Sequence, residues 1–208
     1  AVETQTYTLE EVKVKAAAGS GAAAVASLKA QSPQASKEAS AGKKKRMFVA
    51  GNWKCKGTRE SILALCKELS KRGVEFPEDV EAVIFPSYLH IDLLQQNLGK
   101  PFLVGAQNCF DAGELGDYTG CVTPAMLADY GVKWVLLGHS DRRNSLMESS
   151  ELIASKTGAA LKAGLSVNLT VGETRAQRDA GEHMKALEAQ LAPVAKAVPA
   201  AADWERIV

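Results

Sequence analysis

The sequence predicts an α/β protein built on a parallel β-sheet. Short apolar runs alternate with amphipathic stretches, and the alternation repeats at roughly the length of one strand–helix–strand unit, about thirty residues. Such units are right-handed and place their strands in parallel. The runs that we expect to form strands are 47–51, 80–85, 102–106, 134–137 and 165–171.

Amphipathic helices are expected between these strands. In the stretch 58–72 the apolar positions recur at i, i+3, i+4 and i+7, which is one face of a helix, and Thr58 is a suitable N-cap. The stretches 152–161 and 184–194 follow the same rule. The residues expected to face the core are Ile62, Leu65, Cys66 and Leu69 in the first helix and Met184, Leu187 and Leu191 in the last.

Composition is that of a soluble globular protein. Of the 208 residues, 46% are hydrophobic and 24% are charged, and the apolar runs are too short to span a membrane. A net charge of +1 gives no support to a nucleic-acid partner. The four cysteines, Cys55, Cys66, Cys109 and Cys121, fit no metal-binding spacing and are expected to be reduced thiols in an intracellular compartment.

Residues 1–46 differ in composition from the rest of the chain. They hold eight Lys or Arg against four Asp or Glu, and the part 16–41 is rich in Ala, Ser and Gly, with Glu38 its one acid and no aromatic residue. Such a segment buries too little apolar surface to offset its ordering entropy. We therefore expect a flexible basic extension over 1–46 and a folded domain over 47–208. A solvated linker, an organelle-targeting segment and an arm that docks on a partner are all compatible with this composition.

Periodicity alone leaves two architectures open, a doubly wound sheet and a βα barrel. No Gly-x-Gly-x-x-Gly pattern follows the first strand, which argues against a dinucleotide site. In both architectures, ligands bind at the carboxyl ends of the strands. Candidate functional residues are therefore those that directly follow a strand.

Two strand ends carry such residues. The first strand is followed by Asn52 and Lys54, and a Lys there supplies a fixed positive charge for an anionic substrate, although a Lys at a strand end is also a common solvated side chain. The fourth strand is followed by His139 and by a short helical stretch. The positive end of a helix favours a neutral imidazole that donates a hydrogen bond.

Five segments together resemble the triosephosphate isomerase family in order and spacing. They are Gly51-Asn52-Trp53-Lys54-Cys55, Ala106-Gln107-Asn108-Cys109, Tyr118-Thr119-Gly120, Leu137-Gly138-His139-Ser140-Asp141-Arg142-Arg143 and Gly172-Glu173. The resemblance runs from about Met47 to Val208. It implies a (β/α)8 barrel and the interconversion of dihydroxyacetone phosphate and glyceraldehyde 3-phosphate without a cofactor or a metal.

The resemblance also implies a role for each matching residue. Lys54 binds substrate and stabilises negative charge, Asn52 fixes its loop, and His139 is the neutral electrophile that polarises the carbonyl. In the enzymes of this family, a helix N-terminus keeps this His neutral. Ser140 and Asp141 support these groups, while Thr119 and Arg142 belong to the interface of a homodimer.

This sequence departs from the family pattern at several places. Asp141 is one methylene shorter than the family's Glu, Cys121 replaces an acid that pairs with an Arg across the dimer, and Met147 replaces a Gly. Residues 203–208 are expected to open a sixth strand, and the family's general base is a Glu that follows it beyond Val208. Because a complete barrel needs about 250 residues, we expect an incomplete barrel that is inactive as a lone chain.

Three interpretations stay open. The chain is part of an ordinary isomerase, or a shortened non-catalytic relative within a larger assembly that covers the open edges, or one half of a barrel completed by a separate chain. The pathways implied are glycolysis, gluconeogenesis or carbon fixation. The acid-poor segment favours a plastid, with the cytosol next.

Overall fold

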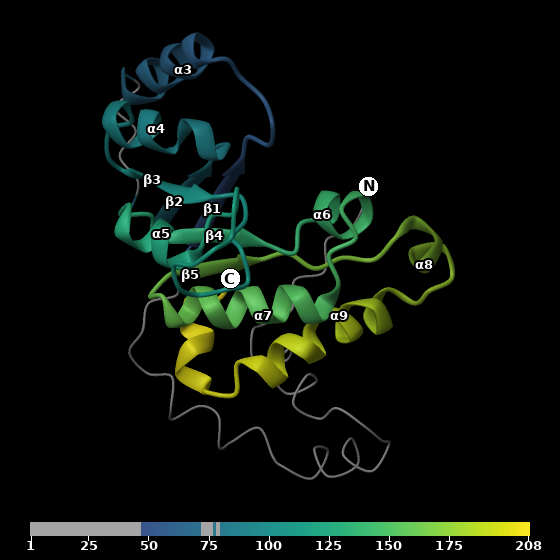
Figure 1. Cartoon of the computed structure of the whole chain (residues 1–208). Helices are drawn as coiled ribbons and strands as arrows, with labels where there is room; N and C mark the ends of the chain where they lie inside the picture. The colour runs from purple at the N-terminus through teal and green to yellow at the C-terminus, as the bar shows by residue number, and fades with distance from the viewer. Residues whose placement is uncertain (1–46, 72–76, 78–79) are drawn as a thin grey trace.

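The computed structural model describes residues 47–71, 77 and 80–208, so the expected extension 1–46 lies outside the described residues. Within them, five parallel strands form a sheet in the order β1-β2-β3-β4-β5 (Figure 1). The strands are β1 (Met47–Asn52), β2 (Val80–Phe85), β3 (Phe102–Ala106), β4 (Trp134–Leu137) and β5 (Ser166–Leu169). A doubly wound sheet reverses its strand order partway, so this unbroken order favours the barrel.

Side chains on the inner face show that the sheet curls. Phe48 of β1 and Trp134 of β4 have ring centroids 4.6 Å apart, although two strands lie between theirs. In a flat sheet three strand spacings would separate them by roughly 14 Å. The Trp134 indole N–H also donates to Glu81 Oε1 at 2.6 Å. The expected incomplete α/β barrel is therefore confirmed.

Helices cover the outer face of the sheet. Figure 1 shows α3 and α4 beside the β1–β3 end and α7 and α9 beside β5. Thr58 caps α3 as predicted, because its Oγ1 accepts a hydrogen bond from the Ser61 N–H at 3.3 Å. The helices are α3 (Arg59–Lys71), α4 (Ile91–Asn97), α5 (Pro124–Asp129), α6 (Ser140–Ser145), α7 (Ser150–Lys162), α8 (Arg175–Asp179) and α9 (His183–Ala197), with 3-10 helices η1 (Tyr88–His90) and η2 (Ala201–Arg206).

The outer core has a large part and a small part. The large cluster joins β4 and β5 to α7, α9 and η2, and the small cluster joins β2 to α3 and α4. Leu65 does not face the core as expected, since 41% of it is exposed, and the Met184–Leu187–Leu191 stripe is only half-buried. Central members of the large cluster are Val135, Leu137, Ile153, Val167 and Val194, and those of the small one are Ile62, Cys66, Ile84, Leu93 and Leu94.

Residues 203–208 differ from the expected strand. Residues 203–206 belong to the 3-10 helix η2, and strand pairing begins at Ile207, which bridges Val167 of β5 in parallel. The Leu169 N–H donates to Val208 O at 2.8 Å, and the Val208 N–H donates to Val167 O at 2.9 Å. A sixth strand position beside β5 thus exists, but it holds only two residues of this chain. None of the helices in the described ranges combines the length and apolar character required to cross a bilayer.

Candidate active site

Lys54 stands on a tightly bonded turn at the end of β1. Its backbone adopts a left-handed conformation with φ of 51°, which is costly for a residue with a Cβ. The Lys54 N–H donates to Asn52 Oδ1 at 2.9 Å, and Gln107 Nε2 donates to Lys54 O at 2.9 Å and to Phe85 O at 2.8 Å. These bonds offset the strain and fix where the Lys54 side chain leaves the sheet.

His139 begins α6 directly after β4. Gly138 precedes it with φ of +75°, and a Cβ at Gly138 would lie 2.6 Å from Thr170 O, so only glycine fits this turn. The His139 ring caps its own helix, because Nδ1 lies 3.1 Å from the Asp141 N–H and accepts its hydrogen bond. A ring nitrogen that accepts must carry a lone pair, so this geometry favours a neutral ring with its proton on Nε2.

Asp141 joins the two strand ends. The Lys54 Nζ lies 3.0 Å from Asp141 Oδ2, and the same oxygen is 3.4 Å from His139 Nδ1. The hydrogen bond from Lys54, supported by the Lys54 charge, holds the pKa of Asp141 below its ordinary value. The curl of the sheet therefore brings together residues from β1 and β4 that the sequence singled out separately.

Arg142 and Ser140 lie where α6 begins but have different surroundings. Arg142 donates through Nε and Nη2 to Glu148 Oε1, both at 2.7 Å, and Lys156 Nζ reaches the same oxygen at 2.6 Å. Burial acts to raise the pKa of Glu148, but the hydrogen bonds from Arg142 and Lys156 outweigh it and lower the pKa. Ser140 is exposed and lines a cavity beside His139.

Thr119 occupies the exposed loop between β3 and α5, whose end is fixed by bonds such as Phe110 N–H to Val122 O at 2.8 Å. Tyr118 next to it packs against Phe110, with ring centroids 4.9 Å apart and the ring planes tilted by 47°. The structure thus places Thr119 on the surface, as an interface role requires, and does not test that role.

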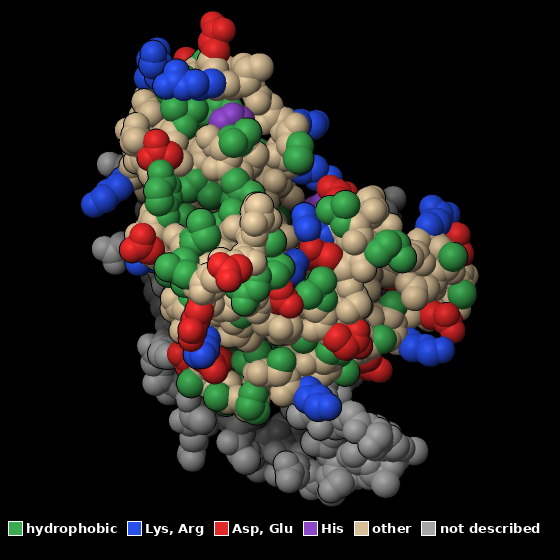
Figure 2. Space-filling view, in the orientation of Figure 1, with side chains coloured by type: hydrophobic (Ala, Val, Ile, Leu, Met, Phe, Trp, Pro, Cys, Tyr) green, Lys and Arg blue, Asp and Glu red, His purple; other side chains and the backbone are tan. Residues whose placement is uncertain are grey.

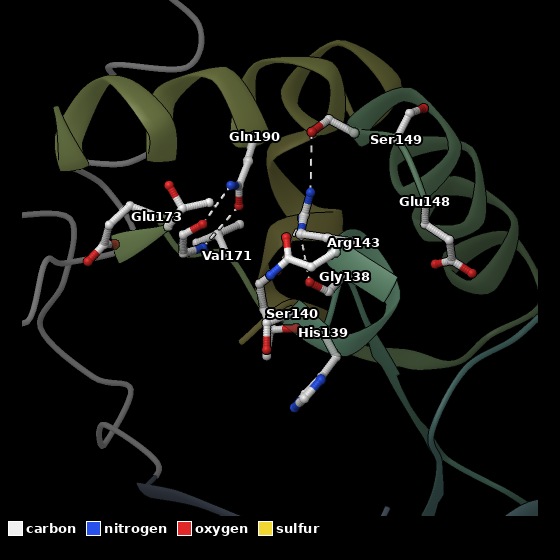
Figure 3. A pocket seen from close by; sticks show the side chains of 14 residues that line it. Gly138, His139, Ser140, Arg143, Glu148, Ser149, Val171, Glu173 and Gln190 are labelled. Carbon is white, nitrogen blue, oxygen red and sulfur yellow. Dashed lines mark hydrogen bonds between the residues drawn. The ribbon is translucent and has the colours of Figure 1, made fainter. Parts of the chain in front are cut away.

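The cavity beside His139 has a volume of about 410 Å³. It lies between the ends of β4 and β5 and the helices α6, α7 and α9; Figure 3 shows the His139 ring pointing away from Arg143 and Gln190. Gln190 Nε2 donates to Gly172 O at 2.7 Å, and the Gly172 N–H donates to Gln190 Oε1 at 2.9 Å. This pair of bonds anchors the segment after β5 to α9.

Three carboxylates lie in or beside this cavity among the described residues, and each is paired with a cation. Asp141 pairs with Lys54, and Glu148 pairs with Arg142 and Lys156. Glu173 pairs with Arg178, and hydrogen bonds from its own backbone and from Arg178 lower its pKa. A carboxylate with a lowered pKa is a weak proton acceptor, so all three are poor general bases.

Several residues of the site were given no role by sequence reasoning: Gln107, Arg143, Glu148, Lys156 and Gln190. One signal was present, since Lys156 falls among Ile153, Ala154, Thr157 and Ala160 on the core face of α7, and a Lys there needs a buried partner. Gln107 stood within a quoted motif but without a function. No group of three metal-binding side chains occurs in the part of the chain that the structure describes.

Comparisons with known proteins point to one family. The family model described as Triosephosphate isomerase matches residues 47–208. Proteins named triosephosphate isomerase are similar to this chain: one from Neurospora crassa is 44% identical over 165 residues, covering 79% of this chain and 64% of the relative. A chloroplastic one from Arabidopsis thaliana is 39% identical over 163 residues (78% and 50%), and a cytosolic one from Oryza sativa subsp. japonica is 36% identical over 164 residues (79% and 63%). The chain thus spans between half and two thirds of the length of these relatives.

Proposed function

Since the chain belongs to the triosephosphate isomerase family, we propose that it carries the substrate-binding and electrophilic part of an active site that interconverts dihydroxyacetone phosphate and glyceraldehyde 3-phosphate. The observation that carries this proposal is the convergence of Lys54, Asp141 and His139 at the carboxyl ends of β1 and β4. Barrel enzymes place their catalytic groups at this end of the sheet.

Each of these residues has a chemical task in such an isomerisation. The reaction moves a proton between adjacent carbons through an intermediate with negative charge on oxygen, and it needs no net oxidation or reduction. His139 donates from Nε2 to the carbonyl oxygen as that charge develops, and the Lys54 ammonium stabilises it and attracts the phosphate. Asn52 fixes the Lys54 turn through its side-chain oxygen, and Asp141 orients the Lys54 ammonium.

The proton-abstracting carboxylate is supplied from outside these 208 residues. The lowered pKa values of Asp141, Glu148 and Glu173 support this, because none of the three suits the task. The pairing of Ile207 and Val208 with β5 marks where a sixth strand carrying such a group would run. A lone 208-residue chain would then bind substrate but not turn it over.

The remaining features of the proposal concern partners and location. Thr119 and Arg142 contribute to a homodimer interface. The compartment is intracellular, a plastid or the cytosol, with carbon fixation or glycolysis and gluconeogenesis as the corresponding pathways. Relatives named chloroplastic and cytosolic support both compartments about equally, at 39% and 36% identity.

A second candidate is a non-catalytic subunit of a larger assembly. It accounts for the exposure of the first strand: Met47 is 62% exposed and Val49 is 49% exposed, an apolar edge that a partner would cover. Two departures from the family pattern point in the same direction: Asp141 stands where the family has a Glu, and Cys121 stands where it has an acid. A separate chain that completes the barrel would cover the same edge.

The test is an isomerase assay on two proteins. The first is the 208-residue chain, for which we expect no turnover. The second is a chimera in which this chain is followed by the C-terminal part of the Neurospora crassa relative, and we expect it to turn over. In the chimera, His139→Gln and Lys54→Ala should each lower kcat by about a hundredfold or more, because both groups act on developing charge.

Lys162→Ala is the matched control. Lys162 is an exposed cation that pairs only loosely with Glu114 at 3.6 Å, so its loss should leave turnover unchanged. A folded chimera without activity would reject the isomerase and favour the structural subunit. Full turnover by the Lys54 or His139 variant would reject the role given to that residue.

A further inference from the structure

Arg143 reaches from α6 back to the ends of two strands. Its Nε donates to Gly138 O at 2.6 Å, its Nη2 donates to Thr170 O at 3.1 Å, and its Nη1 donates to Ser150 Oγ at 3.2 Å. One guanidinium thus joins the end of β4, the residue after β5 and the first turn of α7. Figure 3 shows the Arg143 side chain with Gly138 beside it.

We propose that Arg143 is a positioning residue that fixes the His139 ring by holding the Gly138 carbonyl, so that the ring keeps its proton on Nε2. This inference rests on the proposed function, in which His139 Nε2 donates to the substrate. The resemblance to the family implied no role for Arg143, so its contact with Gly138 is an additional requirement of the site.

The backbone around His139 transmits this constraint. The Gly138 carbonyl belongs to the peptide that enters His139, so holding it fixes the plane of that peptide. On the other side, the His139 carbonyl accepts from the N–H groups of Arg142 at 2.9 Å and Arg143 at 3.1 Å. With both peptides fixed, the Asp141 N–H stays in reach of Nδ1, and the Nδ1 lone pair remains engaged.

Only an arginine satisfies all three acceptors. The guanidinium is a rigid planar fork with five donors, whereas a lysine presents one ammonium at the end of a flexible chain. Space is also limited, because a Cβ at Gly138 would lie 2.7 Å from Arg143 Nη2. Without the guanidinium, the carbonyls of the buried Gly138 and the half-buried Thr170 each lose a donor.

The β5 side of this arrangement is itself well fixed. The Leu137 carbonyl accepts two bonds from Thr170, one from its N–H and one from its Oγ1, each at 2.8 Å. Thr170 therefore holds its own carbonyl in place for Arg143. This makes the end of β5 a firm support against which the His139 turn is positioned.

The experiment compares Arg143→Lys with Arg206→Lys in the 208-residue chain. Arg206 is a matched control, because it also donates to two backbone carbonyls, Leu161 O at 2.9 Å and Leu165 O at 3.4 Å, but at the far end of α7. The tautomer of His139 is read from the 15N signals of its imidazole, assigned with His139→Gln. Both variants are also compared by urea unfolding, which a merely structural role would affect.

In Arg143→Lys, we expect the ratio of Nε2-protonated to Nδ1-protonated His139 to fall about fivefold, the factor that one net hydrogen bond supports. In Arg206→Lys the ratio should stay unchanged although stability falls. An unchanged ratio in a folded Arg143→Lys protein would overturn the inference. If Arg143→Lys does not fold, Ser150→Ala decides, because it frees one side of the guanidinium; it should shift the ratio in the same direction, and no shift would overturn the inference.

The outcome for the positioning role does not depend on turnover. A tautomer shift in a chain whose chimera is inactive would support the positioning and reject the isomerase. In an active chimera, Arg143→Lys should lower kcat roughly tenfold to a hundredfold with KM little changed, because the electrophile is misplaced after substrate has bound.

Discussion

The two ends of the sheet hold their functional residues in different ways. All four residues of β4 are buried, β5 is half-buried apart from the buried Val167, and the large cluster packs both strands against α7 and α9. At β1 all six residues are exposed or half-buried, and the small cluster supports β2, α3 and α4. Figure 2 shows hydrophobic side chains gathered on the surface over the β1–β3 end.

The same contrast appears in the two candidate catalytic groups. The His139 side chain is 22% exposed and caps α6. It follows a turn in which the Gly138 carbonyl accepts a hydrogen bond from Arg143. The Lys54 side chain is 50% exposed and meets an Asp141 side chain that is 57% exposed. His139 must point its N–H at one oxygen, and a packed core holds it in place. Lys54 acts as a point charge over a longer range, and it is held mainly by its backbone turn.

Truncating one isoleucine in each cluster should give the largest difference in stability between the two ends of the sheet. Ile153 is fully buried against β4 and β5, and Ile62 is buried against β2 and α4. We expect Ile153→Ala to lower the free energy of unfolding by about 4 kcal/mol and Ile62→Ala by about 2 kcal/mol, since a less enclosed site can relax around the cavity. Urea unfolding measures both, and equal losses would show that the two cores are equally well packed.

The cluster of Arg142, Glu148 and Lys156 connects the two ends of the sheet. Lys156 Nζ lies 3.4 Å from Asn108 Oδ1, and Tyr88 Oη donates to Asn108 O at 2.6 Å, so the cluster links α7 to the loops after β2 and β3. We expect Glu148→Gln to lower the free energy of unfolding by about 3 kcal/mol at pH 7, because it leaves the buried Lys156 and the half-buried Arg142 without their anion.

This loss should depend on pH. The folded pKa of Glu148 lies below its unfolded value, so its contribution is full above the unfolded pKa of about 4.3 and disappears as the pH falls through the folded pKa. The difference between the wild type and Glu148→Gln should therefore shrink below about pH 4. Glu68→Gln, which removes an exposed partner of Lys71, should change stability by less than about 0.5 kcal/mol. A pH-independent difference would contradict the assignment.

The smallest effect concerns a strained residue between α6 and α7. Met147 has φ of 55° and is 80% exposed, so its side chain gains little packing from this conformation. We expect Met147→Gly to raise the free energy of unfolding by roughly 0.5 kcal/mol, the removed strain less the added chain entropy. Leu146→Gly is the control: its φ is −110°, so the same change should lower stability. Destabilisation by both would show that the loop tolerates Met147 without strain.

The periodic parts of the fold could be predicted from the sequence. The expected runs 80–85, 102–106 and 134–137 match β2, β3 and β4, because apolar runs of this length are typical of strands in a parallel sheet. The short helix after His139 was predicted and is α6, whereas α4, α5 and α8 were not predicted as separate elements, since five to seven residues are too few to show a helical period. Residues 203–206 form a 3-10 helix, although they looked like the start of a strand.

The site was predictable where a residue follows a strand, and not where it acts through distant contacts. Lys54, His139 and Asp141 were found from their positions and from the resemblance, and the structure brings them together. Gln107, Arg143 and Gln190 act by donating to backbone carbonyls that are remote in sequence. Because every residue has a backbone carbonyl, no sequence pattern predicts which one accepts. The interface roles of Thr119 and Arg142 stay predictions.

The contact of Phe48 with Trp134 has a mechanical consequence. These rings sit near the amino ends of β1 and β4, whereas Lys54 and His139 sit at the carboxyl ends of the same two strands. Phe48 packs against an inner cluster that contains Val83, Phe85, Trp134 and Leu136, so the contact holds β1 beside β4 from the inside of the curl. A smaller side chain at position 48 would remove this contact and loosen the support of the site from its opposite end, without touching the site itself.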